Sequence, residues 1–360
     1  MKTLVTGASG FIGSHLAERL LRDGHEVRAM LRASSSRDNI GPALAQGAEV
    51  AVAGLTDPDE IRGAIDGVDV VYHCAGMTAA FDAAPLEAVN AGGTARIFEA
   101  IERCEAPPRR VVLVSSLEAA GQCDPMIARR EYHTVCPHTR YGISKLHGEQ
   151  AAWEAAQRGI AEVVIVRPPI VYGPRDRDVF QMFQAARWGL VGQPGWTTAP
   201  VSVVHVHDLV RGIALAGEAG TPLPINPDDH VLAGGGLATT MISNDPAHSE
   251  GQGIYYFGDG AVHTTTSFCK VMARAFGRRP IVLRIPSAGM WAVGAATEAV
   301  GRLRRKVPAL NLDKVKTSLG TGWFFDHSKA VSELGYLPRL DVERGVEETI
   351  AWLRGAGWLT

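Results

Sequence analysis

The stretch TLVTGASGFIG, residues 3–13, decides the fold of this chain. Its first four residues are typical of a β-strand, and an amphipathic helix is predicted directly after it. Between them lie Gly7, Gly10 and Gly13. In such a unit Gly7 permits a tight turn, Gly10 lets a phosphate approach the backbone and Gly13 lets the helix pack against the strand. Unpaired N–H groups at a helix start bind phosphates, so we expect a dinucleotide-binding loop rather than a glycine-rich turn without a ligand.

Outward from this loop, the first half of the chain alternates apolar strands with helices. Strands are predicted over Thr3–Thr6, Val27–Leu31, Glu49–Ala53, Val68–Cys74, Arg110–Ser115 and Ala161–Arg167. Helices are predicted over Ser14–Asp23, Asp59–Ile65, Ala88–Arg103 and Tyr141–Arg158. This alternation predicts an α/β fold, a doubly wound parallel sheet of the Rossmann type with helices on both faces.

The pattern weakens after Pro168, where proline and glycine become frequent. We therefore expect residues 1–168 to form the dinucleotide-binding domain. Residues 169–360 would form mostly a smaller C-terminal substrate-binding lobe with returns to the main sheet, including helices at Ser267–Phe276 and Val342–Arg354. The stretch 221–253 is rich in Gly, Pro, Asp and Asn, which is typical of an inserted loop or lid.

The composition is typical of a globular protein, and we expect its partner to be a small-molecule substrate. The chain has 360 residues, 46% of them hydrophobic, and a net charge of −2, so neither nucleic acid nor a membrane span is expected. The longest apolar stretch, Met290–Val300, falls short of the about 20 residues that a span needs, and we expect the basic tail after it to be a solvated helix end rather than a membrane contact. The five cysteines include no C-x-x-C pair. With no leader segment expected, they predict reduced thiols and a cytoplasmic protein.

The end of the second strand bears on which dinucleotide binds. Proteins that bind NAD usually place an acidic residue there for the ribose 2′-hydroxyl. Here the strand ends at Leu31, followed by Arg32, three serines and Arg37. A guanidinium at position 32 can bind a 2′-phosphate. We therefore favour NADP(H), with NAD(H) possible if Arg32 is only a surface residue.

Three further residues predict redox chemistry. Tyr141 and Lys145 are four apart on a predicted helix and so share one face. A nearby ammonium lowers a tyrosine pKa, which would let Tyr141 exchange a proton with a substrate oxygen. Ser116 follows the fifth strand, at the sheet edge where such folds bind ligands, and its hydroxyl can hold the same oxygen.

With these motifs the chain resembles the extended short-chain dehydrogenase/reductases over nearly its whole length. The matching segments are residues 6–13 (TGASGFIG), 89–94 (VNAGGT), 114–116 (VSS), 141–145 (YGISK), 167–174 (RPPIVYGP), 204–208 (VHVHD), 326–330 (DHSKA) and 333–336 (ELGY). Residues 27–32 (VRAMLR) and 137–141 (PHTRY) look more like the 3β-hydroxysteroid dehydrogenase and dihydroflavonol reductase branch of the family.

The resemblance assigns roles to individual residues. It implies that Tyr141 is the general acid/base, that Lys145 binds the nicotinamide ribose and that Ser116 orients the substrate oxygen. The family's catalytic serine lies five residues before a glycine, and Gly121 therefore selects Ser116. Tyr172 and Arg175 would bind substrate with it. The expected cofactor-binding set is Gly7, Ser9, Gly10, Phe11, Ile12, Gly13, Arg32, Leu55, Ala75, Gly76, Asn90, Ser115, Tyr141, Lys145, Pro168 and Ile170.

The resemblance also implies a homodimer. Family members often dimerise by packing the helix that carries the tyrosine against its partner. Small residues on that helix are expected to form the contact here: Ala151, Ala152, Ala155 and Ala156.

Two departures from the family pattern refine the interpretation. After the third strand the chain reads Ala53-Gly54-Leu55, without the aspartate that usually touches the adenine. After the catalytic serine it reads Ala119-Ala120-Gly121, where members acting on sugar nucleotides often have Val-Tyr-Gly. The second departure weakens the hypothesis of a sugar epimerase.

Three hypotheses about function follow. The first is an NADP(H)-dependent oxidoreductase acting on a carbonyl or secondary alcohol of a fairly apolar molecule. The second is a nucleotide-sugar epimerase or dehydratase that retains its cofactor, with Arg175, Arg187 and Arg211 facing the diphosphate. The third is a cofactor-binding protein without turnover. His205, His207 and Asp208 resemble metal ligands, but no further ligand lies at helical or hairpin spacing from them. No metal is therefore expected.

Overall fold

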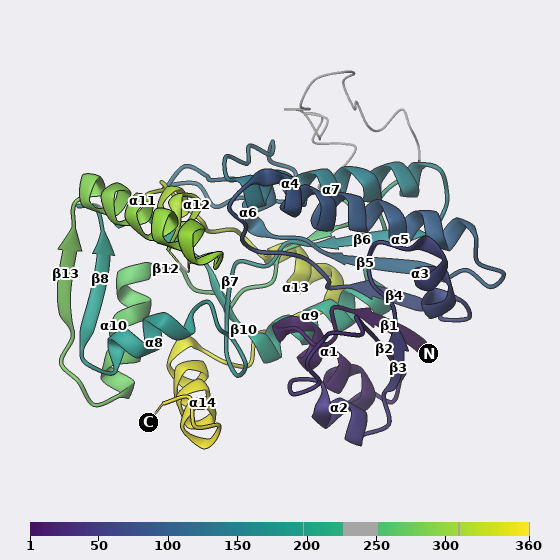
Figure 1. The fold of residues 1–360 in the computed structure, drawn as a ribbon, viewed down its shortest axis with the longest axis horizontal. Coiled ribbons are helices and arrows are strands. Elements are labelled where there is room, and N and C mark those ends of the chain that lie inside the picture. The colour runs from purple at the N-terminus through teal and green to yellow at the C-terminus, as the bar shows by residue number, and fades with distance from the viewer. Residues whose placement is uncertain (197, 226–250, 309, 360) are drawn as a thin grey trace.

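A parallel sheet of seven strands forms the centre of the chain (Figure 1). The structure, a computed structural model, describes residues 1–196, 198–225, 251–308 and 310–359. The strand order across the sheet is β11-β6-β5-β4-β1-β2-β3, and every pairing is parallel. The strands are β1 (Lys2–Thr6), β2 (Glu26–Leu31), β3 (Glu49–Val52), β4 (Val70–His73), β5 (Arg110–Val114), β6 (Glu162–Val166) and β11 (Ile254–Tyr255).

The chain reverses its direction of progress across the sheet between β1 and β4. From β1 it proceeds outward to β2 and β3, then returns to β4 on the other side of β1. Thr6 at the end of β1 pairs with His73 at the end of β4. Parallel sheets bind their ligands at such a switch point, outside the carboxyl ends of the strands. The fold therefore places the loops after β1 and β4 on either side of one crevice.

Two layers of helices cover the two faces of the sheet. One layer contains α3 (Pro58–Ile65), α4 (Ala83–Leu86), α5 (Gly92–Glu102), α6 (Leu117–Ala120) and α7 (Arg140–Gln157). The other contains α1 (Phe11–Arg22), α2 (Gly41–Ala45), α9 (Val206–Ala219) and α13 (Ser328–Leu334). Each layer buries its own apolar core against the sheet, with Phe98 and Trp153 in the first and Leu16 and Ile213 in the second. The predicted doubly wound α/β fold is confirmed.

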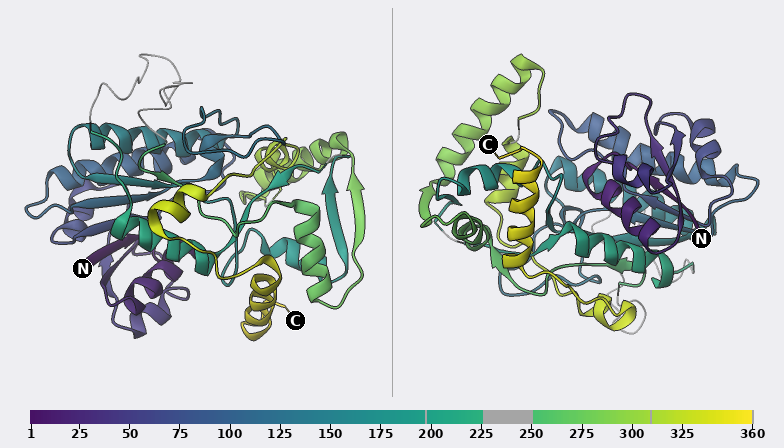
Figure 2. Two further views of the ribbon diagram at one scale, coloured as in Figure 1. Left: turned by 180° about the vertical axis from the view of Figure 1, so that it is seen from behind. Right: turned by 90° about the horizontal axis from the view of Figure 1, so that it is seen from below.

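The second half of the chain builds a smaller lobe beside the sheet, as Figure 2 shows. Its strands are β7 (Ile170–Tyr172), β8 (Leu190–Pro194), β9 (Pro200–Val201), β10 (Val203–His205), β12 (His263–Thr264) and β13 (Ile281–Ile285). Its helices are α8 (Phe180–Ala186), α10 (Thr265–Ala275), α11 (Ser287–Arg304), α12 (Leu312–Ser318) and α14 (Val342–Gly355). Between these elements the chain returns to the main sheet as α9, β11 and α13.

The boundaries of most predicted helices and strands lie within two residues of the observed ones. Two predictions need correction, one about a helix and one about a dimer contact. The single helix predicted over Ala88–Arg103 is instead a π-helical turn, Glu87–Ala91, followed by α5. The alanines expected to form a dimer contact are largely internal, since Ala152, Ala155 and Ala156 are buried in the chain's own core. That interface is therefore wrong, and the homodimer stays a prediction. Of the predicted lid at 221–253, residues 226–250 lie outside the described residues.

Candidate active site

The loop after β1 has the geometry that its glycines predict. Gly7 has a φ of +65°, and a Cβ atom there would lie 2.8 Å from the backbone of Ala75, which follows β4. A Cβ atom on Gly13 would lie 2.4 Å from the carbonyl oxygen of Gly7. Only glycine fits at either position. The loop thus brings the starts of α1 and of the segment after β4 into contact at the switch point.

The first turn of α1 is suited to a pyrophosphate. No side chain caps this helix at Gly10, and its first turn carries no acidic residue. Its N–H groups and the positive end of the helix dipole are therefore available to an anion. The side-chain amide of Asn39 donates to the carbonyl of Ser9 at 3.1 Å, which ties the loop after β2 to the phosphate loop. The residues present fit a dinucleotide.

Arg32 follows β2 directly, at the same edge of the sheet. Its side chain is exposed, and among the described residues it has no hydrogen-bond or ion-pair partner. Leu55 lies further along this edge, where its side chain packs on Gly93 and its carbonyl accepts from Arg96 at 3.2 Å. Arg32 is therefore a cation available to a ligand at the end of β2.

A buried histidine joins the ends of β1 and β4. The Nδ1 atom of His73 lies 2.8 Å from the Thr6 hydroxyl, and its Nε2 atom lies 3.2 Å from the Thr94 hydroxyl. The Ala75 amide donates to the same Thr6 hydroxyl at 3.1 Å. Burial, helped by the Lys145 ammonium, lowers the pKa of His73 to about 3. This network fixes the backbone on both sides of the crevice with a neutral imidazole.

Replacing His73 with glutamine should make stability less sensitive to acid. Below pH 6.5 the unfolded chain binds a proton on His73 that the folded chain does not bind, because the folded-state pKa is about 3. Wild-type stability therefore falls as the pH falls, by about 2 kcal/mol from this group between pH 7 and pH 5. Urea unfolding at the two pH values should show a loss smaller by that amount in His73→Gln. Equal losses would contradict the assignment.

Asn90 holds the segment after β4 from the opposite side. It lies in the π-helical turn before α5, a feature that is frequent at functional sites. Its side-chain oxygen accepts from the Met77 amide at 2.8 Å, and its amide nitrogen donates to the Met77 carbonyl and to the Ser144 hydroxyl, each at 2.9 Å. A Cβ on Gly76 would contact both Asn90 and the Lys145 ammonium. Asn90 therefore links the crevice to α7.

The helix α7 presents Tyr141 and Lys145 from the other side of the crevice. It begins after Thr139, whose hydroxyl accepts from the Gly142 amide at 2.9 Å. The Lys145 ammonium donates to the Val114 carbonyl at the end of β5, at 2.7 Å. Burial lowers the pKa of Lys145 to about 8, although Glu149 opposes this shift. Ser116 lies just beyond β5 and caps α6 by accepting from the Glu118 amide at 3.1 Å.

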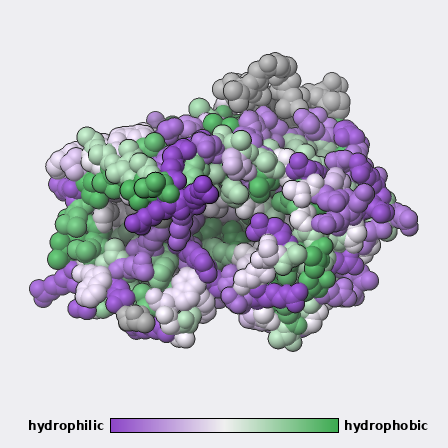
Figure 3. All heavy atoms as spheres, viewed as in Figure 1, coloured by the Kyte–Doolittle hydropathy of each residue, from purple (hydrophilic) through white to green (hydrophobic). Residues whose placement is uncertain are grey.

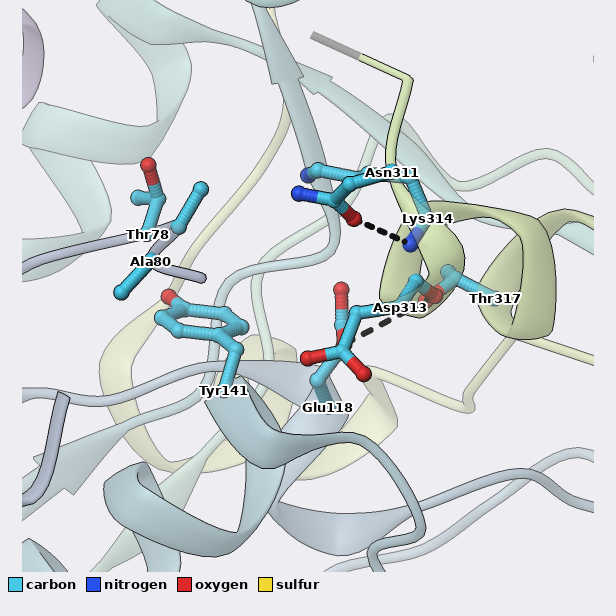
Figure 4. Close-up of a pocket in the computed structure, with 9 residues that line it drawn as sticks. Thr78, Ala80, Glu118, Tyr141, Asn311, Asp313, Lys314 and Thr317 are labelled. Atoms are coloured by element: carbon cyan, nitrogen blue, oxygen red, sulfur yellow. Dashed lines mark hydrogen bonds between the residues drawn. The ribbon is translucent and has the colours of Figure 1, made fainter. Parts of the chain in front are cut away.

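Tyr141 opens onto a pocket between the two lobes (Figure 4). One wall is the segment after β4, and the other is α12 with the residue before it. In the close-up the phenol of Tyr141 points toward Thr78 and Ala80, while the carboxylates of Glu118 and Asp313 lie on the side of α12. The lining residues are Thr78, Ala79, Ala80, Glu118, Tyr141, Asn311, Asp313, Lys314 and Thr317.

Burial and a neighbouring carboxylate act against ionisation of Tyr141. Burial and then the Glu118 carboxylate raise the pKa of Tyr141 well above its usual range, and hydrogen bonding with Ser116 offsets this only in part. The expected lowering of this pKa by Lys145 is therefore not observed. Glu118 accepts from the Thr139 hydroxyl at 2.7 Å, and Asp313 pairs with Arg140 at 3.1 Å. The structure favours the neutral phenol.

A buried ion pair lies beneath the site. Glu149 is one helical turn beyond Lys145, and its carboxylate accepts from Arg167 at 2.6 and 2.9 Å. Both side chains are almost completely buried, at 0% and 1% exposure. The Ser115 hydroxyl also donates to Glu149, so Ser115 points into this pair. Sequence reasoning missed it, although an arginine ending an apolar strand is a recognisable signal.

The two residues expected to bind substrate together with Ser116 lie away from the pocket. Tyr172 is fully buried between His205 and Phe268. Arg175 pairs with Glu18 of α1 at 2.7 Å and donates to Ser14. Neither residue lines the pocket. Pro168 is buried where its carbonyl accepts from the Leu117 amide at 2.8 Å, close behind Ser116, and Ile170 begins β7.

The histidine segment meets a carboxylate that its spacing did not reveal. His205, His207 and Glu348 of α14 have ligand atoms within 4.8 Å of one another. Nδ1 of His207 lies 2.8 Å from Glu348, while Nδ1 of His205 accepts from the His207 amide and so caps α9. The third group comes from a helix distant in sequence, which is why the segment alone did not predict it.

Comparison with known proteins agrees with this geometry. Residues 3–226 match the model of the NAD dependent epimerase/dehydratase family. The chain is 28% identical to a ceramide reductase of Caulobacter vibrioides over 99% of this chain and 95% of that protein. It is 26% identical to a 3 beta-hydroxysteroid dehydrogenase/Delta 5→4-isomerase of Mycobacterium tuberculosis, covering 98% and 90%.

A solved structure supports the same fold. A mutant form of the UDP-glucuronic acid 4-epimerase of Bacillus cereus, solved in complex with NAD, superposes with a TM-score of 0.74 at 20% identity, covering 99% of this chain and all of that one. Family match, sheet order and phosphate loop thus agree, and the chain belongs to the NAD dependent epimerase/dehydratase family, an extended short-chain dehydrogenase/reductase enzyme that binds a nicotinamide dinucleotide.

Proposed function

We propose that this enzyme is an NADP(H)-dependent reductase that transfers a hydride between the nicotinamide and a carbonyl or secondary alcohol carbon. The observation that carries the proposal is the Tyr141 phenol, which lines a pocket beside the segment after β4 and is hydrogen-bonded with Ser116. Lys145 lies one helical turn further along α7. When bound, the cofactor supplies or accepts the hydride. The chain's own residues then have to hold the substrate oxygen and move one proton.

The raised pKa of Tyr141 suits the reducing direction. A phenol that stays protonated can give its proton to a carbonyl oxygen as that oxygen gains charge. Ser116 would donate a second hydrogen bond to the same oxygen. Lys145 would bind the nicotinamide ribose. Pro168 and Ile170 would contact the nicotinamide end of the cofactor.

The pocket suggests a substrate with a polar group beside the reacting carbonyl. Asn311, Lys314 and Thr317 face Tyr141 across the pocket, and only Ala79 and Ala80 are apolar among the lining residues. The half-buried Lys314 has no hydrogen-bond or ion-pair partner through its side chain among the described residues. The curated relatives are named for a ceramide and a hydroxysteroid, which are lipids. We therefore propose an apolar molecule that carries an oxygen substituent near its ketone.

The arginines that would mark a sugar-nucleotide site are used elsewhere. Arg175 pairs with Glu18, and Arg211 is buried against Asp208 at 2.8 Å. Arg187 lies over the ring of Trp188. None of the three lines the pocket, which supports reduction over epimerisation.

The test is a cofactor-coupled assay with the purified chain. NADPH oxidation is followed with a panel of β-oxygenated long-chain ketones, simple ketones, UDP-glucose and UDP-glucuronic acid. We expect net oxidation of NADPH with the oxygenated ketones. Interconversion of a sugar nucleotide, by an enzyme that keeps tightly bound NAD and consumes no added cofactor, would overturn the proposal.

Replacing Arg32 with alanine should reduce the preference for NADPH. Losing a charge-assisted hydrogen bond to the 2′-phosphate costs about 1.5–3 kcal/mol, so KM for NADPH should rise about tenfold to a hundredfold. KM for NADH should stay nearly constant, because NADH lacks that phosphate. Arg279→Ala, an exposed arginine of the smaller lobe, is the matched control. Equal changes in KM for NADPH and for NADH would show that Arg32 does not bind the 2′-phosphate.

A further inference from the structure

The helix α11 exposes apolar side chains to solvent. Exposed fractions are 39% for Trp291, 49% for Val293 and Val300, and 86% for Leu303. Alanines at 288, 292, 295, 296 and 299 are also exposed. Figure 3 shows apolar residues gathered over this helix. A surface helix normally turns such a stripe toward the core.

Contacts on the buried side of α11 fix the rotation of the helix about its own axis. Its buried residues are Met290, Gly294, Glu298 and Gly301. Glu298 accepts from the Leu312 amide at 3.2 Å and lies 3.9 Å from Arg140. Gly294 packs on Val315, where a Cβ atom would lie 2.7 Å from a methyl group. The only charged residue between 288 and 301 therefore faces inward, and the apolar side faces out.

The carboxyl end of α11 is strongly basic. Arg304, Arg305 and Lys306 are exposed and have no hydrogen-bond or ion-pair partner through their side chains among the described residues. Arg302 is already paired with Asp82 and Glu298, each at 3.2 Å. A second copy of the chain packed on this helix would offer the basic end no acidic group from its own α11, because Glu298 is buried. An anionic lipid surface would complement both the apolar side and the basic end.

This surface adjoins the substrate pocket. The helix packs against α12, which with Asn311 forms one pocket wall. Arg302 lies over the ring of Phe81, the residue after the pocket-lining Ala80. Arg140, next to Tyr141, donates to the Phe81 carbonyl.

We propose that α11 docks this enzyme on an anionic lipid bilayer. Val300 and Leu303 would enter the boundary between headgroups and acyl chains together with the exposed alanines at 292, 296 and 299, with Trp291 at the edge of this face, along about 18 Å of helix. The exposed basic residues 304–306, expected from the sequence alone to be a solvated helix end, would instead contact the headgroups. None of the described helices has the length and apolar character needed to cross a bilayer, so the contact lies on one surface. An apolar substrate dissolved in the bilayer would then lie beside the pocket.

The experiment is sedimentation of the purified full-length chain with vesicles. We expect binding to vesicles of phosphatidylcholine mixed with phosphatidylglycerol, weaker binding to phosphatidylcholine alone, and weaker binding in high salt. Changing residues 304–306 together to glutamine should weaken partitioning on the order of a hundredfold, or about fivefold per charge. The pair Val300→Glu and Leu303→Glu should weaken it more than about tenfold. Leu337→Glu, at a site 63% exposed and away from α11, is the matched control.

Two further measurements separate docking from its rivals. Vesicles with brominated acyl chains should quench tryptophan emission in wild type, and Trp291→Phe should lose part of that quenching while it still sediments with vesicles. Binding of NADPH by each variant, followed by fluorescence, confirms that it is folded. The proposal would be overturned if the wild type did not bind anionic vesicles, or if the variant with Val300→Glu and Leu303→Glu still bound them. It would also be overturned if sedimentation velocity showed a wild-type dimer that the same double variant dissociates, since α11 would then be the contact between copies.

Discussion

Replacing Tyr141 with phenylalanine should lower kcat by about 10²–10⁴-fold, the usual contribution of a positioned acid/base. Phenylalanine keeps the ring that packs at the pocket but removes the hydroxyl, so the substrate oxygen would lose its proton donor. The measurement is NADPH oxidation with a carbonyl compound that the wild type reduces. KM for NADPH should change little, because the phosphate loop and the end of β2 are untouched.

The matched control is Tyr132→Phe. Tyr132 is 41% exposed and does not line the pocket, so its variant should retain the wild-type kcat. Dinucleotide binding by both variants should match wild type, which separates loss of chemistry from loss of folding. A Tyr141→Phe enzyme with nearly unchanged kcat would remove this residue from the proposed chemistry. Loss of dinucleotide binding in that variant would instead indicate a structural role.

The sequence predicted the sheet and its ligand edge because both depend on local patterns. The glycine spacing at residues 7–13 sets a turn and a close contact that a neighbouring strand and helix can satisfy at once. Apolar strands between helices can be covered only by helices on both faces. Ser116, Tyr141 and Lys145 were proposed as candidates on the same local grounds, since Ser116 follows a predicted strand and the other two share a helix face, and their roles stay predictions.

The rest of the site depends on contacts between distant segments. Asn311 and Lys314 reach the pocket only because α12 packs across from Tyr141, some 170 positions away along the chain. Glu118 was passed over because nothing in its spacing predicts that α6 turns it toward the phenol. Small residues on α7 looked like an external contact, yet the same pattern suits burial of Ala152 and Ala155 in the core. Periodicity identifies a face but not what covers it.

Replacing Glu149 with glutamine should lower the free energy of unfolding by about 3–5 kcal/mol, because it leaves the Arg167 charge buried without a counter-charge. Glutamine has nearly the same shape, so the loss reflects charge rather than a cavity. Guanidinium unfolding followed by circular dichroism measures it. Glu99→Gln breaks a surface pair with Arg103 whose side chains are 44% and 48% exposed, and it should cost no more than about 1 kcal/mol.

The same substitution should also move the pH dependence of activity. Burial holds the pKa of Lys145 near 8, and the Glu149 carboxylate opposes that depression. Without the carboxylate the ammonium loses a favourable partner, so Lys145 should release its proton at lower pH. The fall in kcat/KM at alkaline pH should therefore begin at a lower pH in Glu149→Gln than in wild type.

The double variant Glu149→Met, Arg167→Met should recover most of the lost stability, because replacing both buried charges with apolar groups is often nearly neutral. It should not restore the wild-type pH at which kcat/KM falls on the alkaline side, since the carboxylate beside Lys145 is still missing. If the double variant recovers both, Glu149 acts only through Arg167 and has no separate effect on Lys145.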